Sequence, residues 1–144
     1  MALLTNIVAA EEDELEAVGE SLHPIDEWSG IERRGIDIAK VVMLHCLLVD
    51  DDFDLATTYY EPVYVNSDGG LVLRFADELL ERLAALDEEG LERTGMELAA
   101  TDTFEYEGWE AAEVEELVME LGELAQLAES QGQVIYVWMY PLMT

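Results

Sequence analysis

The chain of 144 residues carries 34 acidic and 6 basic side chains, a formal net charge of −28 at pH 7, yet 51% of it is hydrophobic. That apolar content excludes a disordered acidic chain, and the length predicts one domain over residues 1–144. The scarcity of Lys and Arg argues against direct binding to nucleic acid or to anionic membranes, which both require clustered positive charge.

Three short features bear on the compartment. Cys46 is the single cysteine, so an internal disulfide is excluded, which favours a reducing compartment such as the cytoplasm. Residues 1–10 lack a basic flank and run directly into Glu11, so they do not predict a signal peptide. The longest apolar run, residues 41–49, is far shorter than the ~20 residues needed to span a bilayer. We therefore expect a cytoplasmic protein.

Three segments are predicted in the first 35 residues. Residues 3–10 are small, β-branched and apolar, and they predict a strand. Residues 11–22 predict a helix, because Leu15 and Val18 fall on one face and the acidic first turn suits the positive end of the helix dipole. Residues 23–35 are interrupted by proline and glycine and predict a loop.

Residues 38–49 predict a helix without a polar side. Asp37 is a suitable N-cap, and residues 41–49 are apolar apart from His45. A helix that is apolar all round is expected to be buried, so we place it at the centre of the domain. An acidic run follows it, consisting of Asp50, Asp51, Asp52 and Asp54.

The middle of the chain predicts a short strand, a turn and two helical segments. Residues 63–66 predict a short strand and residues 67–70 a turn. Residues 71–86 predict an amphipathic helix, because apolar side chains recur there at i, i+3, i+4 and i+7. Residues 87–98 predict a shorter helical piece interrupted by glycine, and residues 101–109 have mixed strand and loop signals.

Residues 110–131 predict the clearest helix, which we expect Gly132 to end. Its solvent side is lined with glutamates, among them Glu113, Glu116 and Glu120. Residues 133–140 predict a closing strand that is apolar on both faces and is therefore covered on both sides. The aromatic and methionine side chains of this last segment are predicted to lie in the core, with an interface as the alternative: Tyr136, Trp138, Met139, Tyr140 and Met143.

The acidic run also matches part of a calcium-binding loop. Carboxylates occupy EF-hand positions one, three, five and twelve, at Asp50, Asp52, Asp54 and Glu61. Position six, however, is Leu55 where the sharp turn requires glycine. Short motifs of this kind match by accident in acidic chains, so a solvated acidic loop is the favoured interpretation, and we predict neither a metal nor a cofactor.

His45 lies within the apolar helix and has two interpretations. The favoured one is a core histidine that is hydrogen-bonded to backbone or to a carboxylate. The alternative is a small enzyme in which His45 and a carboxylate act together in a cleft. Cys46 is expected to be a small core residue, because a reactive thiol requires an electropositive setting. We predict no catalytic residues.

The distributed negative charge is the strongest remaining signal for function. Adaptation to high salt is one explanation. A DNA mimic, whose carboxylates occupy a nucleic-acid-binding cleft, is another. A third is an inhibitor or immunity protein that captures a basic toxin, since complementary charge accelerates association. An acidic protein without a charge-dependent partner is the plainest alternative.

Several motifs together resemble the YfbM-like family, a group of small bacterial proteins of unknown function. The resemblance is carried by the segments Gly35–Lys40, Leu44-His45, Leu47-Leu48, Pro62–Val65 with Phe75, Leu79 and Leu83, and Gly108-Trp109 with Gly132. Two departures are Val41-Val42, where the family has tryptophan near this position, and Asp50-Asp51, where the family has a Thr-Gly turn. The resemblance implies an α+β fold without an established activity, and an immunity role by association with secreted toxins.

We therefore predict several amphipathic helices around one buried helix, packed on a small sheet of N-terminal, C-terminal and short central strands. The predicted function is non-catalytic binding of a basic protein partner, such as a toxin, and the composition also allows a homodimer. The expected partner-binding residues are Asp50, Asp51, Asp52, Asp54, Glu113, Glu116 and Glu120.

Overall fold

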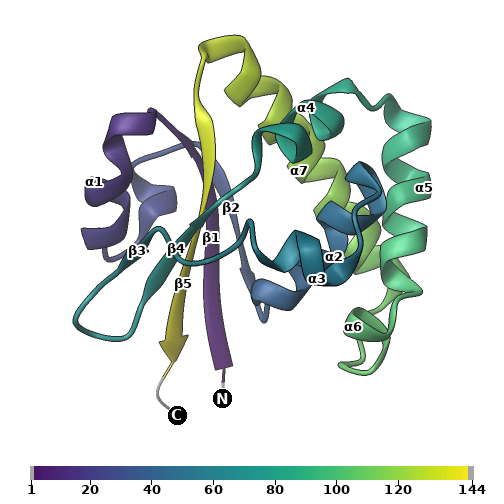
Figure 1. The fold of residues 1–144 in the computed structure, drawn as a ribbon, viewed down its shortest axis with the longest axis horizontal. Helices are drawn as coiled ribbons and strands as arrows, with labels where there is room; N and C mark the ends of the chain where they lie inside the picture. Colours follow the sequence, from purple (N-terminus) through teal and green to yellow (C-terminus); the bar gives the residue numbers. More distant parts are fainter. Residues whose placement is uncertain (1, 143–144) are drawn as a thin grey trace.

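A five-stranded antiparallel sheet in the order β2-β1-β5-β4-β3 forms the centre of the molecule in a computed structural model that describes residues 2–142 (Figure 1). The two longest strands, β1 and β5, pair along their whole length. The strands are β1 (Ala2–Ala10), β2 (Gly30–Arg34), β3 (Tyr64–Val65), β4 (Leu71–Arg74) and β5 (Val134–Leu142).

Helices cover both faces of the sheet, unequally. Figure 1 shows α1 (Leu15–Glu20) on one side and the other α-helices on the opposite side. The helices on that opposite side are α2 (Ile38–Val49), α3 (Phe53–Thr57), α4 (Asp77–Ala85), α5 (Glu88–Ala99), α6 (Asp102–Glu105) and α7 (Ala111–Gln131). Two 3₁₀ turns, η1 (Glu12–Glu14) and η2 (Pro24–Asp26), complete the smaller layer.

Strand β5 has buried side chains on both of its faces, as expected for a central strand that is covered on both sides. Ile135 and Val137 lie in the larger core with the helices, and Tyr136 and Trp138 lie in the smaller core under α1. Of the aromatic and methionine residues predicted for the core, Tyr136, Trp138 and Met139 are buried, Tyr140 is half-buried, and Met143 lies outside the described residues.

The predicted α+β class is confirmed, and two helices match their predicted bounds closely. α2 begins after Asp37, whose carboxylate accepts a hydrogen bond from the Lys40 N–H at 3.1 Å. α7 ends at Gly132, which has the left-handed backbone (φ 68°) expected of a glycine cap. One part of the expectation differs: α2 is buried along one side only, and Met43 and Leu47 on its other side are half-buried.

Two strands were not predicted. Residues 71–86 are not one helix, because Leu71–Arg74 form β4 and pair with β3 and β5, and α4 begins only at Asp77. Residues 23–35 are not simply a loop, because they contain η2 and the edge strand β2, which pairs with β1. Hydrogen bonds to other strands hold Gly30–Arg34 and Leu71–Arg74 in an extended conformation. The local spacing of apolar residues does not predict these bonds.

Smaller differences concern helix lengths. Residues 11–22 form η1 followed by the short α1, so the predicted single helix is divided. α5 runs through its glycines without interruption. A Cβ at Gly95 would lie 2.7 Å from the Cα of Glu115, so glycine there permits the close contact of α5 with α7. Residues 102–105 form α6, and none of the helices within residues 2–142 has the length and apolarity needed to cross a membrane.

Candidate functional site

The acidic run after α2 makes specific contacts within the chain. Asp50 caps α2 with a left-handed backbone (φ 67°), a conformation that Asp and Asn tolerate better than most residues. Asp51 contacts His45, and the Asp52 carboxylate caps α3 by accepting a hydrogen bond from the Leu55 N–H at 2.8 Å. The unfavourable position of carboxylates at a helix C-terminus is therefore offset by local bonds.

The calcium interpretation does not fit this geometry. Phe53–Thr57 are helical, so residues 50–61 lack the open loop that wraps a calcium ion. Within residues 2–142, no group of three or more His, Cys, Asp or Glu side chains is placed to hold a metal ion. The aspartates instead shape the turn between two helices.

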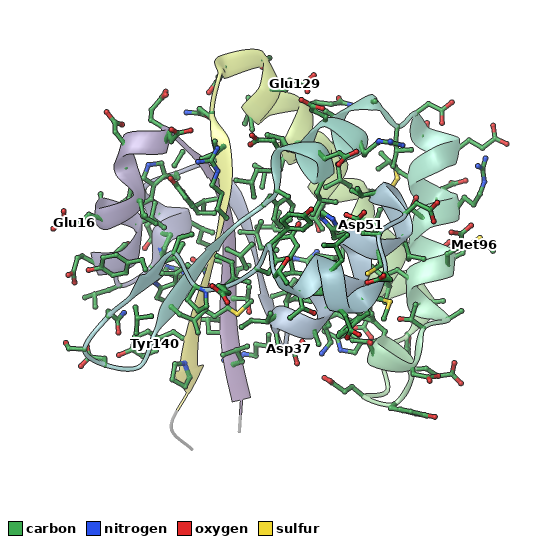
Figure 2. The ribbon with its side chains drawn as sticks, viewed as in Figure 1. Glu16, Asp37, Asp51, Met96, Glu129 and Tyr140 are labelled. Carbon is green, nitrogen blue, oxygen red and sulfur yellow. The ribbon has the colours of Figure 1, made fainter. Side chains whose placement is uncertain are left out.

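Exposed apolar and acidic side chains alternate at the start of α3. Phe53 and Leu55 are 44% and 46% exposed, and Asp50, Asp52 and Asp54 beside them are exposed. None of these three aspartates takes part in the ion pairs formed among residues 2–142. We call these five residues the α3 face. Figure 2 shows Asp51, which follows α2, next to it.

The three predicted glutamates of α7 have a different setting. Glu120 forms an ion pair with Arg33 of β2, and a Glu116 oxygen lies 3.9 Å from the same guanidinium. Glu113 accepts a hydrogen bond from the Glu110 N–H and closes a capping box. These glutamates therefore contact β2 and the start of α7, whereas the α3 face lies at the end of α2 and in α3.

His45 is 1% exposed, and both of its ring nitrogens are occupied. Nε2 lies 2.9 Å from the Asp51 carboxylate, whose oxygen accepts the hydrogen bond. Nδ1 lies 2.8 Å from the Tyr60 hydroxyl, which in turn accepts from the Ala76 N–H at 3.4 Å. This geometry agrees with a core histidine held by a carboxylate.

The same chain of contacts superficially resembles a catalytic Asp-His-hydroxyl arrangement. The Tyr60 hydroxyl, however, is buried, and burial raises the pKa of Tyr60 well above its ordinary value. It donates to His45, so its proton is engaged in a hydrogen bond within the core. Cys46 is half-buried, and burial, together with the charges of Asp51 and Asp52, raises the pKa of its thiol. These groups therefore give little support to acid–base or nucleophilic chemistry.

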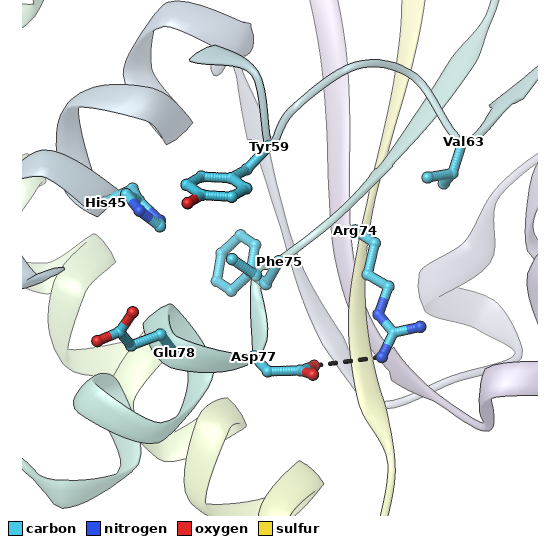
Figure 3. Close-up of a pocket in the computed structure, with 8 residues that line it drawn as sticks. His45, Tyr59, Val63, Arg74, Phe75, Asp77 and Glu78 are labelled. Atoms are coloured by element: carbon cyan, nitrogen blue, oxygen red, sulfur yellow. Dashed lines mark hydrogen bonds and ion pairs between the residues drawn. The ribbon is translucent and has the colours of Figure 1, made fainter. Parts of the chain in front are cut away.

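A hollow of about 520 Å³ lies beside this network, between the segment after α3 and the start of α4 (Figure 3). Its aromatic and apolar walls come from Tyr59, Val63 and Phe75, with His45 at the back. Its polar rim comes from three residues at the β4–α4 junction: Arg74, Asp77 and Glu78. We call this hollow the Tyr59 pocket.

The rim charges of the Tyr59 pocket are unevenly compensated. The Arg74 guanidinium is shared between Asp77 at 3.2 Å and Glu12 at 3.1 Å. Glu78 has only a 3.8 Å contact to Arg82, and both side chains are more than half exposed, so this pair contributes little. The pocket is not evident in the sequence, because the helical spacing of residues 71–86 places Arg74, Asp77 and Glu78 in one continuous helix, whereas the structure divides them between β4 and α4.

Comparisons with known proteins give one fold likeness. No protein-family model matches the chain, and a comparison with curated proteins finds no match. The structure is similar to the crystal structure of YfbM from Escherichia coli, a protein of unknown function, at 14% sequence identity and a TM-score of 0.46. The alignment covers 97% of this chain and 100% of that one.

Proposed function

We propose that the protein is a non-catalytic binding protein that captures a basic protein partner through the α3 face. The observation that carries the proposal is the combination in that face of two exposed apolar side chains, Phe53 and Leu55, with aspartates that have no cationic partner among the described residues. Apolar anchors surrounded by charged side chains are a common composition of protein interfaces.

The net charge supports the same function. A charge of −28 attracts a basic protein over distances set by ionic strength and raises the rate of association. Speed of capture matters most for an immunity or inhibitor protein that must neutralise a toxin before it acts. We therefore propose that the protein is a cytoplasmic immunity or inhibitor protein that neutralises a basic toxin.

A site-specific crosslink tests the proposal. A photoreactive amino acid in place of Leu55 should crosslink one basic protein in cells of the source organism, and mass spectrometry should identify it. The affinity of the purified partner is then measured with the triple variant Asp50→Asn, Asp52→Asn and Asp54→Asn. Asparagine keeps the left-handed backbone and the N-cap, so the variant should fold while losing three charges.

The matched control removes three exposed glutamates from α5, with Glu88, Glu89 and Glu92 changed to Gln. We expect the α3 triple variant to weaken binding at least about tenfold and the α5 variant to weaken it far less, through net charge alone. Equal effects of the two variants would contradict the α3 face as the contact surface. If the partner is a nucleic-acid-binding protein and DNA competes for it, the partner class becomes that of the DNA-mimic alternative.

A further inference from the structure

We propose that the Tyr59 pocket binds one arginine side chain of the basic partner. The inference rests on the proposed function and adds to it a defined receptor for one residue. The pocket has a volume in the range of ligand sites, and its lining combines an aromatic face, apolar walls and carboxylates. Each of these parts matches one part of an arginine side chain.

The aromatic and apolar walls fit the stem and the plane of the guanidinium. Tyr59 is 51% exposed, and its ring lies 5.4 Å from the ring of His45, which supports it from behind. An arginine guanidinium stacks on such a ring and gains a cation–π contribution. Val63 and Phe75 provide the apolar surface against which the methylene stem packs.

The carboxylates of the rim select for positive charge. Of the two rim carboxylates, Glu78 has the longer contact with a cationic side chain of this protein. Figure 3 shows Glu78 on the same side of the pocket as His45. Asp51, behind His45, adds a further negative charge. Arg74 does not reverse the sign, because its guanidinium is held between Asp77 and Glu12. An anionic ligand would meet net repulsion here, whereas a guanidinium forms a forked pair with Glu78.

The position of the pocket links it to the α3 face. Tyr59 follows α3, which ends at Thr57, and so lies close along the chain to Phe53 and Leu55. A partner that contacts the α3 face and the segment after it can place one long side chain in the pocket. Hot-spot residues of interfaces often fill such pockets, and arginine is enriched among them.

Titration with N-acetyl-arginine amide, followed by two-dimensional NMR of the ¹⁵N-labelled protein, tests the pocket directly. We expect saturable shifts at Tyr59, Ala76 and Glu78, and much smaller shifts with N-acetyl-citrulline amide, which has nearly the same shape without the charge. Glu78→Gln and Tyr59→Leu should each weaken binding about threefold or more.

Matched controls separate the pocket from general charge. Glu81→Gln removes one exposed carboxylate from the same helix but outside the pocket, and Tyr106→Leu removes an exposed tyrosine elsewhere. Both should leave binding of the arginine probe unchanged. Absence of saturable shifts, equal binding of the citrulline probe, or equal effects of the control variants would overturn the proposal.

The proposal for the α3 face and the proposal for the Tyr59 pocket can be contradicted independently. If the α3 triple variant loses the partner but Glu78→Gln and Tyr59→Leu bind it normally, the proposed function stands and the pocket proposal is wrong. If the arginine probe binds as expected but the α3 variant keeps full affinity for the partner, the pocket proposal stands and the α3 face is wrong.

Discussion

Nε2 of His45 donates a hydrogen bond to the carboxylate of Asp51 at 2.9 Å, and this contact joins the interior of α2 to the segment that leaves it. The Tyr60 hydroxyl holds the other ring nitrogen at 2.8 Å. The histidine therefore fixes the end of α2, the acidic turn and the segment after α3 relative to one another.

Loss of the Asp51 carboxylate should destabilise the fold, because it leaves the buried Nε2–H of His45 without an acceptor. We expect Asp51→Ala to cost about 1–3 kcal/mol of unfolding free energy, and Asp51→Asn less, since its amide oxygen can still accept. Urea denaturation with matched transition slopes measures both. Asp54→Ala, an exposed change in the same run, should cost about 0.5 kcal/mol or less. Equal costs at Asp51 and Asp54 would contradict the structural role of the His45 contact.

Lys40 is the only lysine, and it is 2% exposed. Its ammonium lies 2.7 Å from Glu107 and 3.6 Å from Asp37, while its stem passes through the core and its Nζ lies 5.7 Å from the centre of the Phe104 ring. We expect Lys40→Ala to cost about 2–4 kcal/mol of stability, because it leaves a cavity in place of the stem.

Lys40→Met separates packing from charge. It keeps an unbranched chain in the core, and the two carboxylates that it leaves unpaired are about half exposed and can be solvated. We expect it to cost less than about 1.5 kcal/mol in the same denaturation experiment. A cost as large as that of Lys40→Ala would show that the ion pair, and not the packed stem, is what stabilises this position.

His23 links η2 to β2 through two carboxylates and should make stability depend on pH. Its hydrogen bonds with Asp26 and Glu32 raise the pKa of His23 above its ordinary 6.5, and the bond with His23 lowers the pKa of Glu32 below its ordinary 4.5. The His23 contribution is complete below pH 6.5 and is lost as pH rises through the raised pKa. The Glu32 contribution is complete above pH 4.5 and is lost as pH falls through the lowered pKa.

The destabilisation caused by His23→Gln should therefore be largest between pH 4.5 and 6.5 and smaller at higher pH. Taking the difference between variant and parent at each pH removes the contribution of the other titrating groups. Urea denaturation across this range measures the difference, and an NMR titration of the His23 ring checks the raised pKa. A cost that is constant or grows at alkaline pH would contradict the ion-pair geometry.

Self-repulsion among the acidic side chains should make the fold sensitive to salt. Six basic residues leave most of the 34 carboxylates uncompensated, so screening should stabilise the folded state. We expect the thermal midpoint to rise by about 4 °C, equivalent to about 1 kcal/mol, between low salt and half-molar sodium chloride. The α5 variant with three glutamates changed to Gln should show a smaller rise. An equal rise in both proteins would point to a general effect of the salt on apolar burial.

The best-predicted elements are those that local contacts define. Asp37 and Gly132 cap α2 and α7 through bonds to residues a few positions away, and the long apolar stripe of α7 is visible without knowledge of its partners. The turn at residues 67–70 likewise depends on its own glycines, although it connects β3 to β4 and does not lead into a helix as predicted. Such features can be predicted from the sequence because the contacts that define each of them lie between residues a few positions apart.

The strands β2 and β4 depend on partners far away in the chain. Val72 lies opposite Trp138 and Arg34 opposite Leu4, so the backbone bonds that define each short strand come from β5 or β1. Residues 71–76 also satisfy a helical spacing, and nothing local distinguishes the two outcomes. The energy of the cross-strand bonds and of burial against β5 decides between them.

The candidate site likewise has some features that the sequence determines and others that only the tertiary structure decides. Composition alone determined that the protein is acidic and apolar enough to fold, and the sequence located the acidic run after α2. Only the tertiary structure decided that Asp51 faces inward to His45 while Asp50, Asp52 and Asp54 face solvent beside Phe53 and Leu55. Only the packing of β4 and α4 against the segment after α3 created the Tyr59 pocket, because its walls come from residues that no local spacing connects.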